Sequence, residues 1–206
     1  MKQLRTDSIA PLAISALATS AITAIAIHAL GWMTLYYTAR LIVIPAFAFI
    51  FIYAVNRPQM GQRILKGWLF GLIAVSFYDL SRIPFLMMGW GDFIPSIGNW
   101  VMGTEHVDPI IGYAWRYIGN GGGLGIAFVL LMHCFKLKGN KILIGTIYGI
   151  AVWATLTLLL VISPNARALL FELSPLSLMG SFIGHFVYGL VLGLLLHFSS
   201  RNKQVG

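Results

Sequence analysis

The sequence predicts an all-α fold: a polytopic membrane bundle of six transmembrane helices, with a short interfacial segment on the outer side. Three observations predict it. Hydrophobic residues make up 58% of the 206 residues and charged residues only 10%, whereas about a quarter of the residues in a soluble domain are charged. The mean hydropathy is +0.83. The apolar runs are continuous rather than alternating, which favours helices over a barrel.

Six apolar runs are long enough to be membrane spans. A bilayer core about 30 Å thick needs roughly 20 mostly apolar residues per helix. The runs predict spans at about residues 9–30, 41–56, 66–89, 110–133, 142–163 and 176–198. They leave no soluble domain over, so we expect residues 1–206 to form a single integral membrane domain.

The first two spans carry features of their own. The first apolar run extends from Ile9 to at least Leu30 and is longer than the roughly 7 to 15 residues of a signal-peptide core, so we expect it to be retained as a span. Cleavage at an A-x-A site formed by Ala24 and Ala26 is the alternative. The second run is the shortest and contains Pro45, so we expect it to be kinked, tilted or partly interfacial.

The basic residues fall on one side of the predicted spans. Acidic residues occupy the opposite loops, at Asp92, Glu105, Asp108 and Glu172. Ten of the 14 basic residues lie in the terminal segments and in two loops, at Lys2, Arg5, Arg57, Arg63, Lys66, Lys136, Lys138, Lys141, Arg201 and Lys203. This positive-inside asymmetry predicts that both termini are cytoplasmic. The net charge of +8 therefore reflects topology and a weak attraction to anionic lipid rather than a nucleic-acid partner.

The outer loop "WGDFIPSIGNWVMGTEH", which begins at Trp90, predicts a short helix lying on the outer surface. Phe93, Ile97, Trp100 and Val101 recur at helical spacing, and Trp90 and Trp100 suit a membrane–water boundary. The segment is interpreted as an aromatic anchor. A lid over a pocket that opens outward is the alternative.

Ionisable residues inside the predicted spans identify a candidate site. Such groups cost on the order of 3 kcal/mol at a helix centre, so they usually face the protein interior and pair there. Asp79 and Arg82, in "YDLSRIP", are one helical turn apart and can pair. Arg116, in "YAWRYIGN", and His185, in "GHFVYG", lie in the outer parts of the fourth and sixth spans.

Depth brings these residues together. At about 1.5 Å per residue, Asp79 lies roughly 15 Å from the outer end of its span, Arg82 roughly 10 Å, Arg116 roughly 9 Å and His185 roughly 14 Å. Tyr78, Ser81, Asn120 and Tyr188 lie at compatible depths. A polar chamber open toward the outer face follows, with ligand- or proton-binding candidates Asp79, Arg82, Arg116, Asn120, His185 and Tyr188. The alternative is that the Asp79–Arg82 pair and His185 only fix helix packing.

The sequence offers no pattern for catalysis, a metal or a cofactor. His106, with Glu105 and Asp108 beside it, is the densest group of potential ligands, but H-E-x-x-H and C-x-x-C patterns are missing. There is no G-x-S-x-G motif. The single Cys134 has no partner for an intramolecular disulfide. We therefore predict no catalytic residue, no bound metal and no cofactor. The sequence favours a protein that is not an enzyme, and a membrane-embedded enzyme is the alternative with the least support.

A resemblance is carried by the segments "YDLSRIP", "GTIYGIAVW", "SPNARALLF" and "GHFVYGLVLGLL". These segments resemble small uncharacterised bacterial inner-membrane proteins, the YagU-like proteins and their relatives. The similarity rests mainly on Trp153 and on a run in the last span, at Gly184, His185, Tyr188, Gly189 and Gly193. A departure is that the fourth span carries Arg116 and Asn120 where those proteins tend to have a histidine. The resemblance implies a location in a bacterial inner membrane and supplies no mechanism.

The glycine-rich stretch "YIGNGGGLGIAF", residues 117–128, predicts close helix packing rather than a nucleotide loop, since neither a preceding strand nor the P-loop lysine is present. Glycines four residues apart recur in four spans and let helices approach closely. A break in the helix at Asn120 would turn this packing face into the wall of a site.

Two function classes follow. In one, the polar cluster binds or translocates a small molecule or protons. In the other, the protein is a structural or accessory subunit. The lipid bilayer is the expected partner, and a membrane-protein partner or a homo-oligomer stays open.

Overall fold

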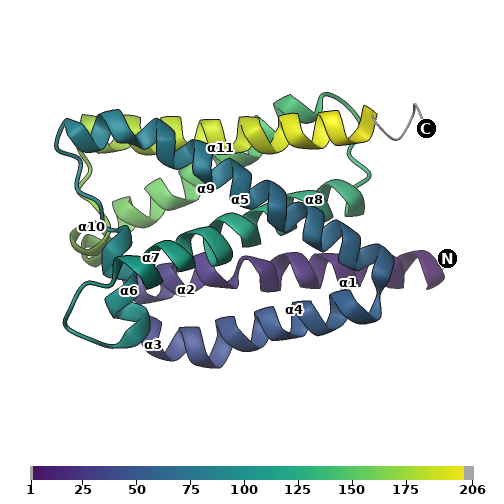
Figure 1. The fold of residues 1–206 in the computed structure, drawn as a ribbon, viewed down its shortest axis with the longest axis horizontal. Helices are drawn as coiled ribbons and strands as arrows, with labels where there is room; N and C mark the ends of the chain where they lie inside the picture. Colours follow the sequence, from purple (N-terminus) through teal and green to yellow (C-terminus); the bar gives the residue numbers. More distant parts are fainter. Residues whose placement is uncertain (1, 202–206) are drawn as a thin grey trace.

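The computed structural model of the protein describes residues 2–201, with side chains described from residue 9 to residue 200. Within this range every regular element is helical (Figure 1). The α-helices are α1 (Lys2–Ala18), α2 (Ser20–Ala29), α3 (Leu35–Thr38), α4 (Ile44–Asn56), α5 (Pro58–Met87), α6 (Ile94–Met102), α7 (Pro109–Ala114), α8 (Gly122–Cys134), α9 (Lys141–Ile162), α10 (Pro164–Leu169) and α11 (Pro175–Arg201). Two π-helical turns, η1 (Ala39–Val43) and η2 (Trp115–Gly121), join α3 to α4 and α7 to α8.

Five continuous helical stretches are long and apolar enough to cross a membrane, at Leu35–Asn56, Pro58–Met87, Pro109–Cys134, Lys141–Ile162 and Pro175–Ser200. The pair α1 and α2 meets the same criteria together, although it bends by 49° between Ala18 and Ser20. Counting that pair as one span gives up to six. These lengths and compositions indicate a multi-pass membrane protein, and the helices fit a bundle.

The stretch Leu35–Asn56 begins earlier than residue 41, the predicted start of the second span. The π-helical turn η1 carries the helix through Arg40. The Arg40 guanidinium lies 3.6 Å from the centre of the Tyr36 ring and donates hydrogen bonds to the carbonyl oxygens of Tyr36 and Val101. These contacts hold the charge at the end of the helix. Pro45 follows the π-helical turn, in the first turn of α4.

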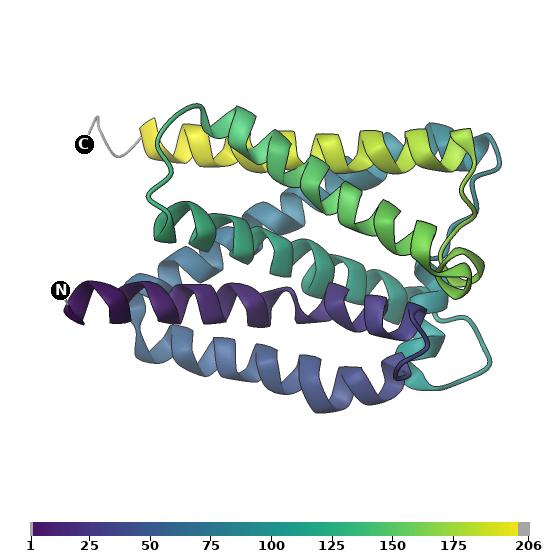
Figure 2. The same ribbon diagram turned by 180° about the vertical axis from the view of Figure 1, so that it is seen from behind.

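The helix bundle has two ends, and different loops and short helices lie at each. In both views α1 begins and α11 ends at the same end of the bundle, where the α8–α9 loop and the α4–α5 junction also lie (Figures 1 and 2). The helices α6 and α10 lie at the other end. Among the described loops, those predicted to form the basic side therefore lie together at one end of the bundle. The side chains of Lys2, Arg5, Arg201 and Lys203 lie outside the described part of the chain.

Glycines let three helix pairs approach closely. A Cβ added at Gly145 would lie 2.5 Å from the carbonyl oxygen of Gly189, where α9 packs on α11. A Cβ added at Gly125 would lie 2.6 Å from the Cα of Gly71, where α8 packs on α5. A Cβ at Gly123 would overlap the carbonyl oxygen of Ala18 in α1. At these positions a side chain would meet backbone that cannot move aside.

Helix α6 packs on the end of the bundle with one face. Ile94 and Ile97 are buried, and Gly98 lies against the backbone of Asp108. Trp90, just before α6, is only 5% exposed and packs edge-on against Phe171 at 5.4 Å. The anchor role predicted for Trp90 is therefore wrong, because this ring is enclosed by the protein.

Candidate functional site

Four charged side chains form a continuous chain near the α6 end of the bundle. Arg116, in η2, donates from Nε to the two carboxylate oxygens of Asp79 at 2.8 and 3.0 Å. Arg82, one turn after Asp79 in α5, lies 3.6 Å from the same carboxylate and donates to Asp92 at 2.9 Å. The predicted Asp79–Arg82 pair is present, but each residue has a closer partner elsewhere.

Asp92 closes the chain at the start of α6. It accepts hydrogen bonds from the Tyr113 hydroxyl at 2.6 Å and from the backbone N–H of Ile94 at 3.1 Å. Burial raises the pKa of the Asp92 carboxyl, but the hydrogen bonds from Tyr113, Arg82 and Ile94 outweigh burial and hold the pKa below its usual range. Sequence reasoning missed Asp92 and Tyr113 as site residues because Asp92 lies in a loop whose return path the sequence does not reveal.

The predicted break at Asn120 is a π-helical turn rather than a gap in the helix. It carries Arg116 and Asn120 among the glycines that pack against α1, α2 and α5. Side chains of three neighbouring helices donate to backbone carbonyls around it: Trp68 to Ile118 at 3.3 Å, Tyr188 to Gly121 at 2.7 Å and Tyr148 to Leu124 at 3.0 Å. Single π-helical turns inside α-helices are frequent at functional sites.

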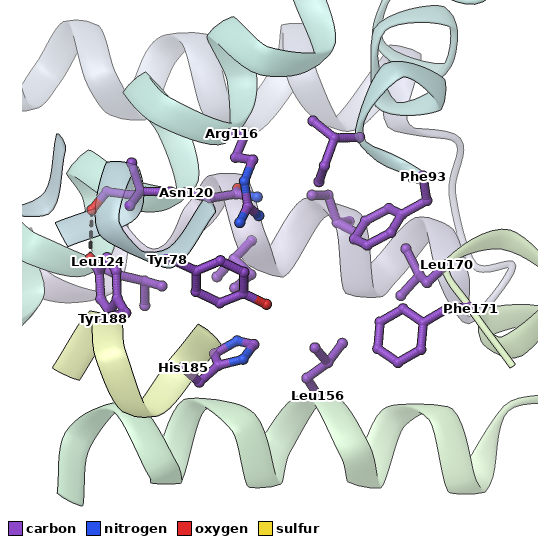
Figure 3. Close-up of a pocket in the computed structure, with 15 residues that line it drawn as sticks. Tyr78, Phe93, Arg116, Asn120, Leu124, Leu156, Leu170, Phe171, His185 and Tyr188 are labelled. Atoms are coloured by element: carbon purple, nitrogen blue, oxygen red, sulfur yellow. Dashed lines mark hydrogen bonds between the residues drawn. The ribbon is translucent and has the colours of Figure 1, made fainter. Parts of the chain in front are cut away.

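A cavity of about 90 Å³ lies beside this π-helical turn. Its polar lining residues come from three helical segments, and Figure 3 shows the side chains of Tyr78, Arg116 and His185 around one space. The structure thus brings four predicted site residues to one cavity, together with Tyr78, whose ring lies 4.5 Å from the Arg116 guanidinium carbon: Arg116, Asn120, His185 and Tyr188. Asp79 and Arg82, the other two predicted site residues, do not line it.

His185 presents a hydrogen-bond acceptor to this cavity. Its Nδ1 lies 2.7 Å from the carbonyl oxygen of Ser181. A carbonyl can only accept, so Nδ1 carries the proton and Nε2 is the acceptor of the neutral ring. Within the described part of the chain, Nε2 has no hydrogen-bond partner and His185 forms no ion pair. The ring is buried, stands edge-on to Tyr78 at 5.0 Å, and points into the cavity (Figure 3).

Asn120 adds a second polar group without a partner. Its Oδ1 atom is buried and accepts no hydrogen bond from any described residue. An unsatisfied buried amide oxygen costs on the order of 1 to 3 kcal/mol. Its place in the lining beside Arg116 means that a bound molecule could relieve this cost after a rotation of the amide.

Three apolar side chains line the cavity on the side of α6 and α10. Phe93, Leu170 and Phe171 line it and also line a separate surface hollow of about 430 Å³. The rings of Phe93 and Phe171 lie 5.9 Å apart. The chamber predicted to open toward the outer face therefore has an apolar wall on that side.

The described side chains do not form a metal-binding cluster. No group of three or more His, Cys, Asp and Glu side chains that could hold an ion occurs among the residues described. Glu105 and His106 are exposed. The prediction that the chain binds no cofactor is not tested by this geometry.

Comparison with known protein families finds no matching family model, and no curated protein or solved structure matches the chain. The resemblance to the YagU-like proteins stays a prediction.

Proposed function

We propose that this protein is a bacterial inner-membrane protein with six spans and cytoplasmic termini, and that its outer-half cavity binds a small uncharged molecule that donates a hydrogen bond. Helix α6 would then be the outer interfacial segment. The observation that carries the binding proposal is the acceptor Nε2 of His185: the residue is buried and lines the cavity, and this nitrogen has no hydrogen-bond partner in the described chain. Intramembrane ionisable residues of this kind commonly mark ligand or ion pathways.

The charges around the cavity favour an uncharged ligand. Arg116 is the only charged side chain in the described lining, and both oxygens of Asp79 already accept from it. An anion would have to compete with that carboxylate. Asp79 does not reach the cavity, so the geometry favours binding over proton transfer through this carboxylate.

A structural or accessory role is the second candidate, and the ion-pair chain favours it. Asp92, Arg82, Asp79 and Arg116 tie α5, η2 and the start of α6 together. In this alternative, a membrane-protein partner or a second copy of the chain supplies the function, and His185 only positions α11.

The two candidates separate in a ligand-binding experiment on the purified protein in detergent micelles. Saturation-transfer NMR with 1-butanol, butyrate and butylamine would report contact with each probe. We expect saturable transfer to 1-butanol, and a loss of it in His185→Phe, because phenylalanine keeps an aromatic side chain but lacks both ring nitrogens, Nε2 among them. The matched control is His106→Phe at an exposed position. Equal transfer to 1-butanol in wild type and His185→Phe, with both folded, would favour the structural role.

A further inference from the structure

A groove between α2 and α9 adjoins the cavity. It has a volume of about 260 Å³. Its ten lining residues are apolar apart from two threonines, and five of them also line the cavity: Ile22, Ile25, Leu124, Leu156 and Leu170. The polar cavity and the apolar groove therefore adjoin, with these five side chains common to both linings.

The groove opens on a flank of the bundle. Helix α9 packs mainly on α11, and in Figure 2 it runs obliquely from α11 toward α2. Thr23 of α2 and Thr155 of α9 are exposed on the two sides of the groove. Both lie well inside predicted spans, so the groove faces the hydrocarbon region in the proposed topology.

On the α6 side the cavity adjoins the surface hollow of about 430 Å³, which shares Phe93, Leu170 and Phe171 with it. That hollow is also lined by Asp92, Arg167 and Glu172, so it suits water or a polar group, whereas the mainly apolar groove suits an aliphatic chain. A ligand arriving from the bilayer meets this groove beside the cavity that His185 lines.

We propose that the ligand is a single-chain aliphatic alcohol, or a lipid with the same uncharged hydroxyl head, which reaches the cavity sideways from the bilayer. This inference rests on the proposed binding function. The hydroxyl donates to Nε2 of His185, and the chain lies between α2 and α9. A carboxylate or phosphate head fits poorly because Arg116, the only charged side chain among the described residues that line the cavity and the groove, is already paired with Asp79.

Photolabelling tests the proposal on the full chain in lipid nanodiscs. The probe is hexadecanol with a diazirine in mid-chain, and hexadecanoic acid with the same diazirine is the comparison. We expect the alcohol to label α2 and α9 at the groove, with competition by unlabelled hexadecanol. Thr155→Trp fills the groove from an exposed position and should lower labelling about tenfold, while Leu158→Trp, exposed on α9 outside the groove, should not. Thr23→Trp obstructs the groove from α2 and serves as the second variant.

The possible results separately test the binding function, the lipid ligand, its uncharged head and its lateral route. Saturable contact with 1-butanol but no specific labelling by the alcohol probe overturns the lipid ligand and leaves the proposed function standing. Failure of both probes overturns the proposed function as well. Labelling that is stronger with the acid overturns the uncharged head. Labelling that survives both tryptophan variants but rises in Phe93→Ala assigns access to the α6 end and overturns the lateral route.

Discussion

Four charged side chains near the α6 end neutralise one another in order along a chain from Asp92 through Arg82 and Asp79 to Arg116. Arg82 is 2% exposed and Arg116 8%, so each guanidinium has left water almost completely. Ions that leave water are tolerated only when they are paired and hydrogen-bonded. Since each guanidinium has a carboxylate partner, the network carries no net formal charge, and the cavity beside it is polar without being an ion site.

Removing Asp79 should destabilise the fold. Asp79→Asn leaves the buried Arg116 without a carboxylate partner and removes one of the two ion pairs of Arg82. Breaking a buried pair by removing one member costs roughly 3 to 5 kcal/mol, so we expect a loss of about 3 kcal/mol in unfolding by sodium dodecyl sulfate, followed by tryptophan fluorescence. Glu105→Gln, at an exposed acid without an ion pair in the described chain, is the control. Unchanged unfolding of Asp79→Asn would show that the network contributes no stability.

The sequence predicted part of this site through depth. Helical rise placed Asp79, Arg82, Arg116 and His185 in one layer, and three of these residues interact directly as a chain of ion pairs. A residue's depth along its helix does not predict how that helix is rotated about its own axis. The sequence therefore could not favour an Asp79–Arg116 pair over an Asp79–Arg82 pair. The Arg82–Asp92 ion pair could not be predicted, because it depends on how the loop before α6 folds back toward α5.

Several pairs of helices pack with their backbones in close contact. In α8, successive glycines lie against α5 and α1, and in α9 and α11 glycines face one another. Between apolar helices in lipid no hydrophobic effect favours association, so van der Waals packing at short distance has to supply it. The π-helical turn η2, which carries Arg116 and Asn120, directly precedes the glycines of α8.

An alanine at Gly125 should separate α8 from α5. Its Cβ would lie 2.6 and 2.7 Å from the Cα and N of Gly71, and backbone cannot rotate away as a side chain can. Overpacking costs about 1 to 3 kcal/mol, so we expect Gly125→Ala to lower the midpoint of thermal unfolding in detergent. Gly91→Ala, where an added Cβ meets nothing within 4 Å, is the matched control. Equal midpoints for the two variants would contradict the close contact.

Long apolar runs made the helical stretches predictable, because apolar length alone separates them from the loops. The π-helical turns were not predictable, since no residue pattern distinguishes them from an α-helix and they depend on contacts with neighbouring helices. Helix α10 was missed although a signal exists: Ser163 accepts from the N–H of Ala166 and Pro164 occupies the first turn, which is a common start for a helix.

Among the described loops, acidic residues are concentrated at one end of the bundle and basic residues at the other, with Arg40 and Arg167 as exceptions at the acidic end. The acidic residues Asp92, Glu105, Asp108 and Glu172 belong to the segments around α6 and α10, whereas Arg63 and the lysines of the α8–α9 loop belong to the other end. The cavity lies nearer the acidic end, because Phe93, Ile94 and Phe171 cover it. If the basic end is cytoplasmic, the cavity lies in the outer leaflet, and its groove samples outer-leaflet lipid.

Cysteine accessibility tests that orientation directly. The chain has a single cysteine, so Cys134→Ser provides a background free of thiols. Into it we would place Glu105→Cys between α6 and α7 and Lys138→Cys between α8 and α9, both exposed. With a membrane-impermeant maleimide on intact bacterial cells, we expect Glu105→Cys to react at once and Lys138→Cys only after permeabilisation, because positively charged loops are retained in the cytoplasm. The reverse pattern would place the groove in the inner leaflet, and reaction of both without permeabilisation would contradict a span between them.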